Sequence, residues 1–270
     1  MDTTVIMSSY NQPKSMALGL YALTLQDDLD FELIVADDGS GPEVGDMVAD
    51  FAKTAPFPVR FITQDDDGFR KPTILNKAAS IANGNKLIFL DGDCIPLQKH
   101  VSQHVAGLDK GSFCVGGCVF VPPGDTLGLT SDDIKNGRLS EFITPEALAP
   151  LKKKHRASIW QPLFGSKAYP RIFGCNLSVK RDVFFTVNGY DESFNGLGKE
   201  DSDLRNRLRN NDFKGVSLLV KNIVCHLDHA LDRKSHTVAN KRAPDKKYYE
   251  SRKKALTAAK GLKELACLKD

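Results

Sequence analysis

The first ninety residues alternate short apolar runs with segments of helical periodicity. Short apolar runs bounded by polar or glycine-rich residues predict buried strands. The expected strands cover residues 3–8, 31–37, 59–63 and 86–90, and the expected helices between them cover about 14–25, 44–53 and 71–82. This β-α-β alternation predicts an α/β fold with a mostly parallel sheet flanked by helices.

The regular alternation stops after Asp93. Further strands are expected at 113–121, around 173–181 and at 215–224, with mixed helix and loop over 125–170 and an amphipathic helix at about 201–210. The lysine-rich residues that follow are mostly helix-forming. We therefore expect a single α/β domain over residues 1–230 and a lysine-rich, mostly helical C-terminal extension over 231–270.

Acidic or glycine-rich residues follow the early strands, at the end where open α/β sheets bind ligands. In LIFLDGDC, residues 87–94, Asp91 and Asp93 end a strand on the same side of its pleat. Gly92 between them leaves room for a ligand to approach the backbone. These carboxylates favour a site for Mn²⁺ or Mg²⁺ with substrate phosphates, although a solvated Asp-Gly-Asp turn has the same sequence.

A second pair of carboxylates, Asp37 and Asp38, occurs in VADDGSG at residues 35–41. One of the two is expected to accept hydrogen bonds from uracil or a ribose hydroxyl, as acidic residues do in other nucleotide-binding folds. The other is expected to hold the Gly-Ser-Gly turn through hydrogen bonds to its own backbone.

The segment GLGKEDSDLRNRL, residues 196–208, presents Glu200 and Asp201 at the start of a helix, after a glycine-rich loop. Helix capping explains one carboxylate at such a place, because the helix dipole stabilises negative charge there. It does not explain the whole cluster. A carboxylate beside a sugar acceptor removes the proton of the attacking hydroxyl, so we interpret this pair as the source of a general base.

Two histidines, His226 and His229, follow the last expected strand. A single histidine in such a loop is more often structural than metal-binding. Two of them, in a chain with a separate acidic pair, make a mixed carboxylate and imidazole site for Mn²⁺ chemically reasonable. Which of the two would bind the ion stays open.

Composition narrows the class of protein. Thirty-seven Lys and Arg residues against thirty-four Asp and Glu give a net charge of +3, which does not predict a nucleic-acid-binding protein. The N-terminus lacks the pattern of a secretory signal, and no run approaches the roughly 20 apolar residues of a membrane helix. The six cysteines are scattered without a CxxC pair, so we interpret them as reduced thiols of a cytoplasmic protein.

Taken in order, these motifs resemble those of the inverting family 2 glycosyltransferases, which have the GT-A fold. TVIMSSYNQP resembles the loop after their first strand, ADDGSG their second nucleotide-contacting element, and LDGDC their DxD strand. DDDGFRKPTILNKA is similar to the segment that opens a helix with a basic residue and an asparagine. NGYDESFNGLGKEDSDLRNRL is similar to the acceptor-side segment of β-1,4-galactosyltransferases and bacterial chondroitin-type polymerases.

Carried over residue by residue, the resemblance implies a donor site, a metal site and a catalytic pair. The nucleotide-sugar site would consist of Ser8, Tyr10, Asn11, Asp37, Asp38, Arg70, Asn76, Asp91 and Gly92. The metal site would consist of Asp93, Asp91 and His226, with His229 as an alternative ligand. Asp201 would be the base, Glu200 would hold the acceptor, and Arg70 would neutralise the leaving diphosphate. Lys199 and Leu197 stand where the galactosyltransferases have glycine and tryptophan, which leaves the acceptor and the donor sugar open.

The implied reaction moves galactose, N-acetylgalactosamine, glucose or N-acetylglucosamine from a UDP-sugar to a glycan or lipid-linked glycan. The implied destination is a bacterial surface polysaccharide or lipopolysaccharide. Such acceptors lie at the inner membrane, where the lysine-rich tail would make peripheral contact with anionic lipid. A solvated C-terminal helix is the alternative interpretation of the tail.

Three other functions share parts of this pattern. A phosphatase with Asp91 as nucleophile would carry its acidic motif on the first strand, whereas three βα units precede it here. A nucleotidyltransferase would need a glycine-rich basic loop after the first strand, where this chain has SSYNQPK. A non-catalytic sugar-binding module would have no need of the Glu200–Asp201 pair.

Overall fold

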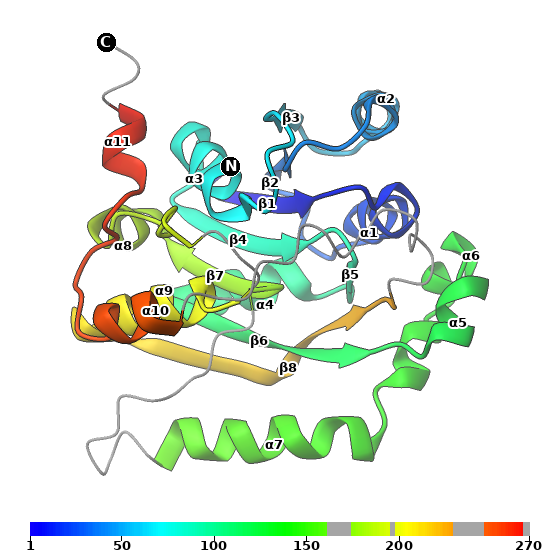
Figure 1. The fold of residues 1–270 in the computed structure, drawn as a ribbon. Helices are drawn as coiled ribbons and strands as arrows, with labels where there is room; N and C mark the ends of the chain where they lie inside the picture. The colour runs from blue at the N-terminus through cyan, green and yellow to red at the C-terminus, as the bar shows by residue number, and fades with distance from the viewer. Residues whose placement is uncertain (161–173, 195–197, 229–245, 267–270) are drawn as a thin grey trace.

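The computed structural model describes residues 1–160, 174–194, 198–228 and 246–266. An eight-stranded mixed sheet runs through this part of the chain, with helices on both of its faces (Figure 1). The strands are β1 Thr3–Ser9, β2 Phe31–Asp37, β3 Val59–Thr63, β4 Lys86–Asp91, β5 Cys94–Pro96, β6 Phe113–Phe120, β7 Asn176–Lys180 and β8 Gly215–His226. Their order across the sheet is β3-β2-β1-β4-β7-β6-β8-β5.

The helices of the first half are α1 Pro13–Thr24, α2 Pro42–Ala52, α3 Lys71–Ile81 and α4 His100–Leu108. Those that follow are α5 Pro123–Gly128, α6 Ser131–Lys135, the 3₁₀ helix η1 Arg138–Phe142, α7 Pro145–Trp160, α8 Arg181–Thr186, α9 Glu200–Asn210, α10 Lys246–Arg252 and α11 Leu262–Ala266. Proline stands in the first turn of α1, α2 and α3, where its fixed backbone angle suits helix initiation and its missing N–H costs no hydrogen bond.

The parallel half of the sheet, β3-β2-β1-β4, has helices packed on both of its faces. Its central strands are therefore almost wholly buried, which explains why their sequences are nearly continuous apolar runs. Successive residues still alternate between two cores. Ile6 and Ile34 pack in the core with α3, whereas Val5 and Leu33 pack in the core with α1 and α2.

The strand register brings the acidic motifs to one edge of the sheet. Ser8 of β1 pairs with Asp91 of β4, and Ser9 pairs with Asp37 of β2. All three strands run parallel, so their carboxyl ends meet at this edge. The candidate donor-site residues of three separate motifs consequently lie together.

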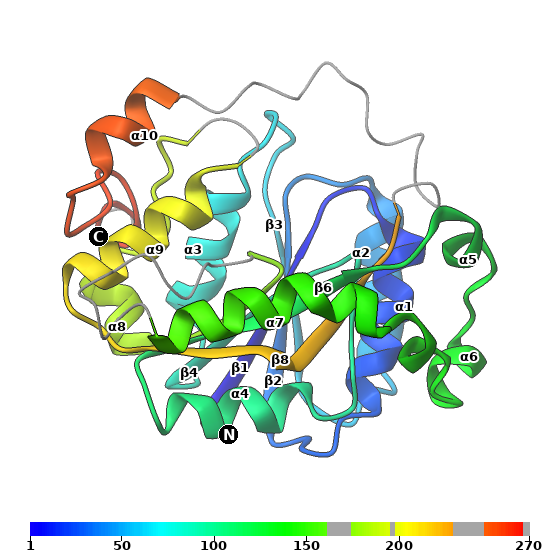
Figure 2. The same cartoon turned by 90° about the horizontal axis from the view of Figure 1, so that it is seen from below.

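The other half of the sheet adds antiparallel strands and carries the second group of candidate residues. Strand β7 runs antiparallel between β4 and β6, and the short β5 runs antiparallel to β8. Helices α4 and α7 lie across this half (Figure 2). Cys94 pairs with His226, and the backbone N–H of Leu227 donates to the carbonyl of Asp93 at 2.8 Å. The end of β8 is therefore joined directly to the acidic motif after β4.

The strands and helices expected from the sequence are confirmed in the first half to within about two residues. In the second half, the strand expected at 215–224 extends to His226 and the helix expected at 201–210 begins at Glu200. The expected α/β fold is therefore correct.

The described part of the C-terminal tail packs against the domain. Its described residues form two short helices, α10 and α11, joined by a non-helical stretch. Ala258 and Leu262 are only 6 % exposed each, and Leu262 belongs to the same core as α3 and α9. The backbone N–H of Ala258 donates to the carbonyl of Val187 at 2.9 Å. Residues 246–266 are thus packed against the domain.

Among the described helices, none is both long enough and apolar enough to span a bilayer.

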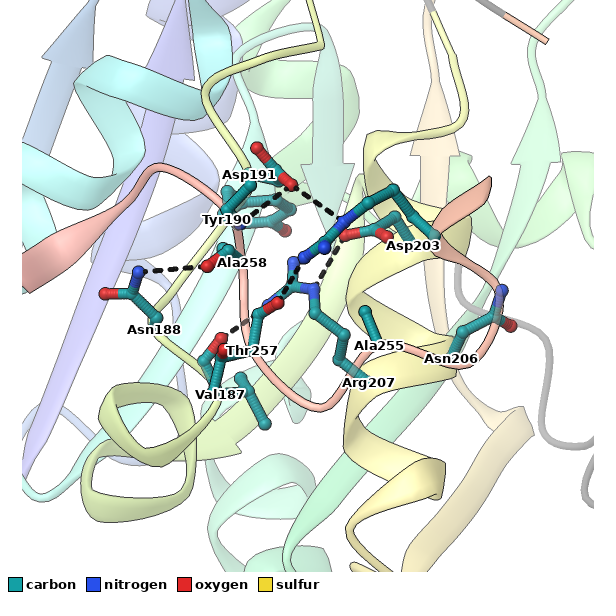
Figure 3. A network of polar contacts seen from close by, with 12 residues as sticks. Val187, Asn188, Tyr190, Asp191, Asp203, Asn206, Arg207, Ala255, Thr257 and Ala258 are labelled. Carbon is teal, nitrogen blue, oxygen red and sulfur yellow. Dashed lines mark hydrogen bonds and ion pairs between the residues drawn. The ribbon is translucent and has the colours of Figure 1, made fainter. Parts of the chain in front are cut away.

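A buried ion pair fixes α9 against the segment that precedes it (Figure 3). Arg207 is fully buried, and its Nε donates to Asp203 at 2.7 Å. Its Nη1 donates to the carbonyls of Val187 and Gly189 at 2.7 and 2.6 Å. One side chain therefore joins helix α9 to the turn after α8.

Replacing Arg207 with methionine should lower the free energy of unfolding by about 3–5 kcal/mol, because Asp203 then stays buried without its cation. Urea denaturation at pH 7 measures the change. In the double variant Arg207→Met/Asp203→Asn, part of the stability should return, since no buried charge is left uncompensated. A loss below about 1 kcal/mol in the single variant would contradict this account of the ion pair.

Candidate active site

A pocket of about 680 Å³ opens where the two halves of the sheet meet. It brings together residues from the ends of β4 and β8 and the starts of α3 and α9. Its lining includes Lys71, Asp91, Cys118, Cys175, Glu200, Asp201 and His226. The structure therefore unites three motifs that lie far apart in the sequence, and these are the DGD turn, the Glu-Asp pair and the histidine after the last strand.

Asp91 is held at the floor of the pocket by two donors. Lys71 Nζ lies 2.5 Å from its Oδ1, and Ser8 Oγ donates to the same oxygen at 2.8 Å. Burial opposes ionisation of Asp91, but the Lys71 ammonium and these hydrogen bonds outweigh it and hold the pKa of the carboxyl below its usual value. Asp91 is therefore an anion whose charge is already paired within the protein.

Asp93 faces the end of β8. His226 Nε2 lies 3.6 Å from its Oδ2, and Gln12 Nε2 donates to that oxygen at 3.3 Å. The side chains of Asp93, Cys94 and His226 offer ligand atoms that all lie within 4.8 Å of one another. The convergence of Asp93 and His226, expected from the sequence, is thus present in the structure. His229 lies outside the described residues.

Three cysteines surround this position. Cys94 of β5, Cys118 of β6 and Cys175, just before β7, are in mutual hydrogen-bonding contact through their thiols. All three are free, as are the other described cysteines. No sequence motif indicates this group, because its members are separated by more than twenty residues and come from different parts of the sheet.

Glu200 and Asp201 form the first turn of α9. Burial, together with the charge of Asp201, raises the pKa of Glu200 to about 8. Burial also raises the pKa of Asp201, to about 6, although the Lys71 ammonium opposes that shift. At neutral pH the pair therefore combines a protonated Glu200 with an ionised Asp201. In these states Glu200 is able to donate a hydrogen bond and Asp201 is able to accept a proton.

Gly174 makes room for Asp201. An added Cβ at Gly174 would collide with all three atoms of the Asp201 carboxylate, and the Gly174 backbone N–H hydrogen-bonds to that carboxylate. The chain before β7 therefore positions the carboxylate from outside α9.

Asp37 and Asp38 have different hydrogen-bond partners, and Asp37 has the turn-holding role expected of one of the two. Asp37 Oδ2 accepts from Ser40 N at 2.8 Å and from Thr63 Oγ1 at 2.9 Å, so it holds the turn after β2. Asp38 accepts from Gln64 Nε2 at 2.6 Å and from Arg70 N at 2.9 Å. Burial raises the pKa of Asp38 to about 6.

The loop after β1 is bonded to the loop after β2. Asn11 N donates to Ser40 Oγ at 2.7 Å, and Gly41 N donates to Asn11 Oδ1 at 3.3 Å. Tyr10 Oη donates to Asp66 at 3.2 Å. These contacts join the loops after the first three strands into one surface beside the pocket.

Two residues assigned to the donor site occupy other places. The Arg70 guanidinium bonds to the Asp65 carbonyl and lies 4.0 Å from Asp67 in its own loop, whereas its neighbour Lys71 lines the pocket. Asn76 is fully buried: its Nδ2 donates to the Tyr190 carbonyl at 2.9 Å, and its Oδ1 accepts from Tyr190 N at 2.8 Å. Asn76 thus ties α3 to the acceptor-side segment and has no part in the pocket.

A family model described as "Glycosyl transferase family 2" matches residues 4–162, which is more than half of the chain. The chain belongs to glycosyl transferase family 2. A second model, "N-terminal domain of galactosyltransferase", matches residues 154–233 and so contains Glu200, Asp201 and His226. Membership of family 2 separates this chain from the phosphatases and nucleotidyltransferases that share parts of its motifs.

Two curated relatives of this family 2 chain illustrate the range of similarity. Validoxylamine A glucosyltransferase of Streptomyces hygroscopicus subsp. limoneus is 26 % identical over 229 residues, which are 76 % of this chain and 47 % of that protein. Chondroitin synthase of Escherichia coli is 24 % identical over 219 residues, 76 % of this chain and 32 % of that protein. The chain thus spans less than half the length of either.

Solved structures confirm the expected GT-A fold of this family 2 member. Residues 1–349 of S. aureus TarS with UDP-GlcNAc superpose with a TM-score of 0.65 at 16 % identity, covering 93 % of this chain and 64 % of that one. The mannosyltransferase PcManGT of Pyrobaculum calidifontis, with GDP-Man and Mn²⁺, superposes with a TM-score of 0.58 at 18 % identity. The match covers 83 % of this chain and 56 % of that one.

Replacing Gly92 with alanine tests how closely β1 and β4 approach at the pocket. An added Cβ would lie 2.8 Å from the Ser8 carbonyl oxygen, and backbone yields less readily than a side chain. Overpacking of this kind should lower the free energy of unfolding by about 1–3 kcal/mol, as measured by chemical denaturation. Gly124→Ala is the matched control, because nothing lies within 4 Å of its added Cβ. Equal stability of the two variants would refute the close approach.

Proposed function

We propose that this protein transfers a hexose from a UDP-sugar to a glycan hydroxyl, with inversion at C1. One observation carries the proposal: a single pocket is lined by the Lys71–Asp91 pair, by His226, which contacts Asp93, and by the carboxyls of Glu200 and Asp201, whose pKa values are raised. A displacement reaction at a sugar phosphate needs a cation, a metal site and a base. The names of the relatives, a glucosyltransferase and a chondroitin synthase, support it, as do solved neighbours with UDP or UDP-GlcNAc.

The residues around Asp93 fit a divalent cation, Mn²⁺ or Mg²⁺. Asp93 supplies a carboxylate and His226 an imidazole, and their ligand atoms already lie close together. Borderline ions such as Mn²⁺ accept this mixed donor set. Mn²⁺ accompanies the nucleotide-sugar or nucleotide in two of the structural neighbours. A cation held here would neutralise charge on the departing diphosphate.

Lys71 and Asp91 prepare the donor side of the pocket. The Lys71 ammonium adds positive charge beside the place where the diphosphate leaves, the task first assigned to Arg70. Ser8 and Lys71 hold one Asp91 oxygen and leave the other oxygen to accept hydrogen bonds from the donor sugar or ribose. Asp38, with the loops that carry Tyr10 and Asn11, forms the binding surface for the nucleoside, since its carboxylate has lone pairs beyond those that Gln64 and Arg70 use.

Asp201 removes the proton in this reaction. The acceptor oxygen attacks C1 from the face opposite the diphosphate while its proton passes to Asp201, and the bond from C1 to the phosphate oxygen breaks. Glu200 retains its proton at neutral pH and donates a hydrogen bond that orients the acceptor. The glycan or lipid-linked glycan acceptor and a place in bacterial surface polysaccharide synthesis, at the inner membrane, belong to this proposal.

UDP release from a panel of UDP-hexoses, with and without glycan acceptors, tests the function directly. We expect release that needs Mn²⁺ or Mg²⁺, stops in EDTA, and is lost in Asp93→Ala and His226→Ala. Both variants should also bind Mn²⁺ more weakly, as measured by electron paramagnetic resonance without substrate. Asp50→Ala, at an exposed carboxylate on α2, should match the wild type in both measurements. Undiminished activity in EDTA would refute the metal site, and absence of release from every donor would refute the function.

The pH dependence tests the two carboxyl roles. With Asp201 needed ionised and Glu200 needed protonated, kcat/KM should rise with pH through about 6 and fall through about 8. Asp201→Asn should lower kcat by about 10²–10⁴ and leave donor KM unchanged. Glu200→Gln should raise acceptor KM and remove the alkaline fall. If Glu200→Gln instead causes the large loss of kcat, then Glu200 is the base.

A further inference from the structure

The tail segment, residues 246–262, lies outside both ranges that the family models match. It nevertheless lies beside helix α9, whose first turn carries Glu200 and Asp201 (Figure 2). Its two adjacent tyrosines, Tyr248 and Tyr249, contact described residues on either side of the loop that leads into α9. This arrangement connects the end of the chain to the proposed catalytic carboxyls.

Tyr248 contacts the flank before the loop. Its hydroxyl donates to Asp191 Oδ2 at 2.9 Å, and its ring packs edge-on against Phe194 with centroids 5.1 Å apart. The backbone N–H of Ala259 donates to the same Asp191 oxygen at 3.1 Å. Asp191 and Phe194 are both buried, so the tail supplies part of the environment in which this flank is folded.

Tyr249 contacts the flank after the loop. Lys199 Nζ lies over the Tyr249 ring, 5.3 Å from its centroid, and Asn206 Nδ2 donates to the Tyr249 hydroxyl at 3.3 Å. Lys199 directly precedes Glu200 and has a left-handed backbone with φ of 81°. Residues other than glycine adopt this conformation only when their surroundings hold them in it.

The tail also joins the acceptor-side segment to α3. Glu192 N donates to the Lys260 carbonyl at 2.9 Å, while the Glu192 side chain accepts from Asn76 of α3 at 3.0 Å. Helix α3 begins at Lys71, the cation of the pocket. One connected set of contacts therefore runs from the tail to the segment before the carboxyl pair and to the helix that carries Lys71.

We propose that Tyr249, supported by Tyr248, is a positioning residue for the carboxyl pair. Its ring stabilises the left-handed Lys199 and thereby fixes where Glu200 and Asp201 begin helix α9. An exposed cation–π contact changes a local equilibrium by about two- to fivefold, so the loss of the ring should loosen this turn by that factor without unfolding the domain. The catalytic role of Glu200 and Asp201 rests on the proposed function, whereas the effect of Tyr249 on the position of these two residues does not.

The experiment compares Tyr249→Leu with Tyr249→Phe in the full-length protein. Hydrogen–deuterium exchange of peptides covering residues 199–206 should be about two- to fivefold faster in Tyr249→Leu and unchanged in Tyr249→Phe, which keeps the ring. With the donor found by UDP release, Tyr249→Leu should lower kcat severalfold and leave donor KM and UDP affinity unchanged. Lys253→Met is the control, because Lys253 lies over the same ring at 5.8 Å but is not attached to the loop.

If hydrogen–deuterium exchange of residues 199–206 is as slow in Tyr249→Leu as in the wild type, the inference is wrong, whatever the transferase activity of the variant. Faster exchange throughout the protein, with a large fall in melting temperature, would also overturn it, because the ring would then serve the core as a whole. If the wild-type protein releases UDP from no donor, the proposed function fails while the exchange result still decides the positioning role. Faster local exchange with unchanged kcat would overturn the link to catalysis.

Discussion

The ammonium group of Lys71 allows three carboxyl groups to share one pocket. Asp91 comes from strand β4, and Glu200 and Asp201 come from helix α9, and their mutual repulsion would otherwise oppose the fold that brings them together. Lys71 interacts favourably with Asp91, Asp201 and Glu200, and its own pKa is raised by those charges in spite of burial. The order of ionisation in the pocket follows from burial, which raises the pKa of Glu200 and Asp201, and from this cation, which opposes that shift. Asp91 beside it stays an anion, Asp201 is ionised at neutral pH, and Glu200 keeps its proton.

Lys71 has to be held in place, and a buried side chain of the helix that carries it, α3, anchors that helix. Asn76, one turn further along α3, exchanges two hydrogen bonds with Tyr190 and a third with Glu192. The acceptor-side segment in turn is fixed by Arg207 and by the C-terminal tail. The cation and the carboxyls are thus parts of one packed unit, even though more than a hundred residues separate them in the chain.

Local pattern was enough to predict the strands and the α/β fold, and the resemblance to family 2 glycosyltransferases implied the GT-A fold and a site that unites Asp93 with His226. It did not distinguish Arg70 from Lys71, because consecutive residues at a helix start point about 100° apart and only packing decides which one faces the pocket. The three-cysteine group and the tail contacts are long-range, with no spacing rule to reveal them. Asn76 looked like a binding residue because a buried amide that joins two segments has the same sequence signature as one that binds a ligand.

The two halves of the pocket are built in different ways. Asp93 and His226 are joined through the hydrogen bonds between β5 and β8, so their separation is set by the ladder of a sheet. Glu200 and Asp201 follow a loop whose last residue has a left-handed backbone, and they are held by side chains from elsewhere in the chain. We therefore expect substitutions in the tail to alter the half that contains Glu200 and Asp201 and to leave the other half intact. In the proposed reaction, a scaffold of this kind lets selection change the molecule that receives the sugar while the binding of the nucleotide is preserved.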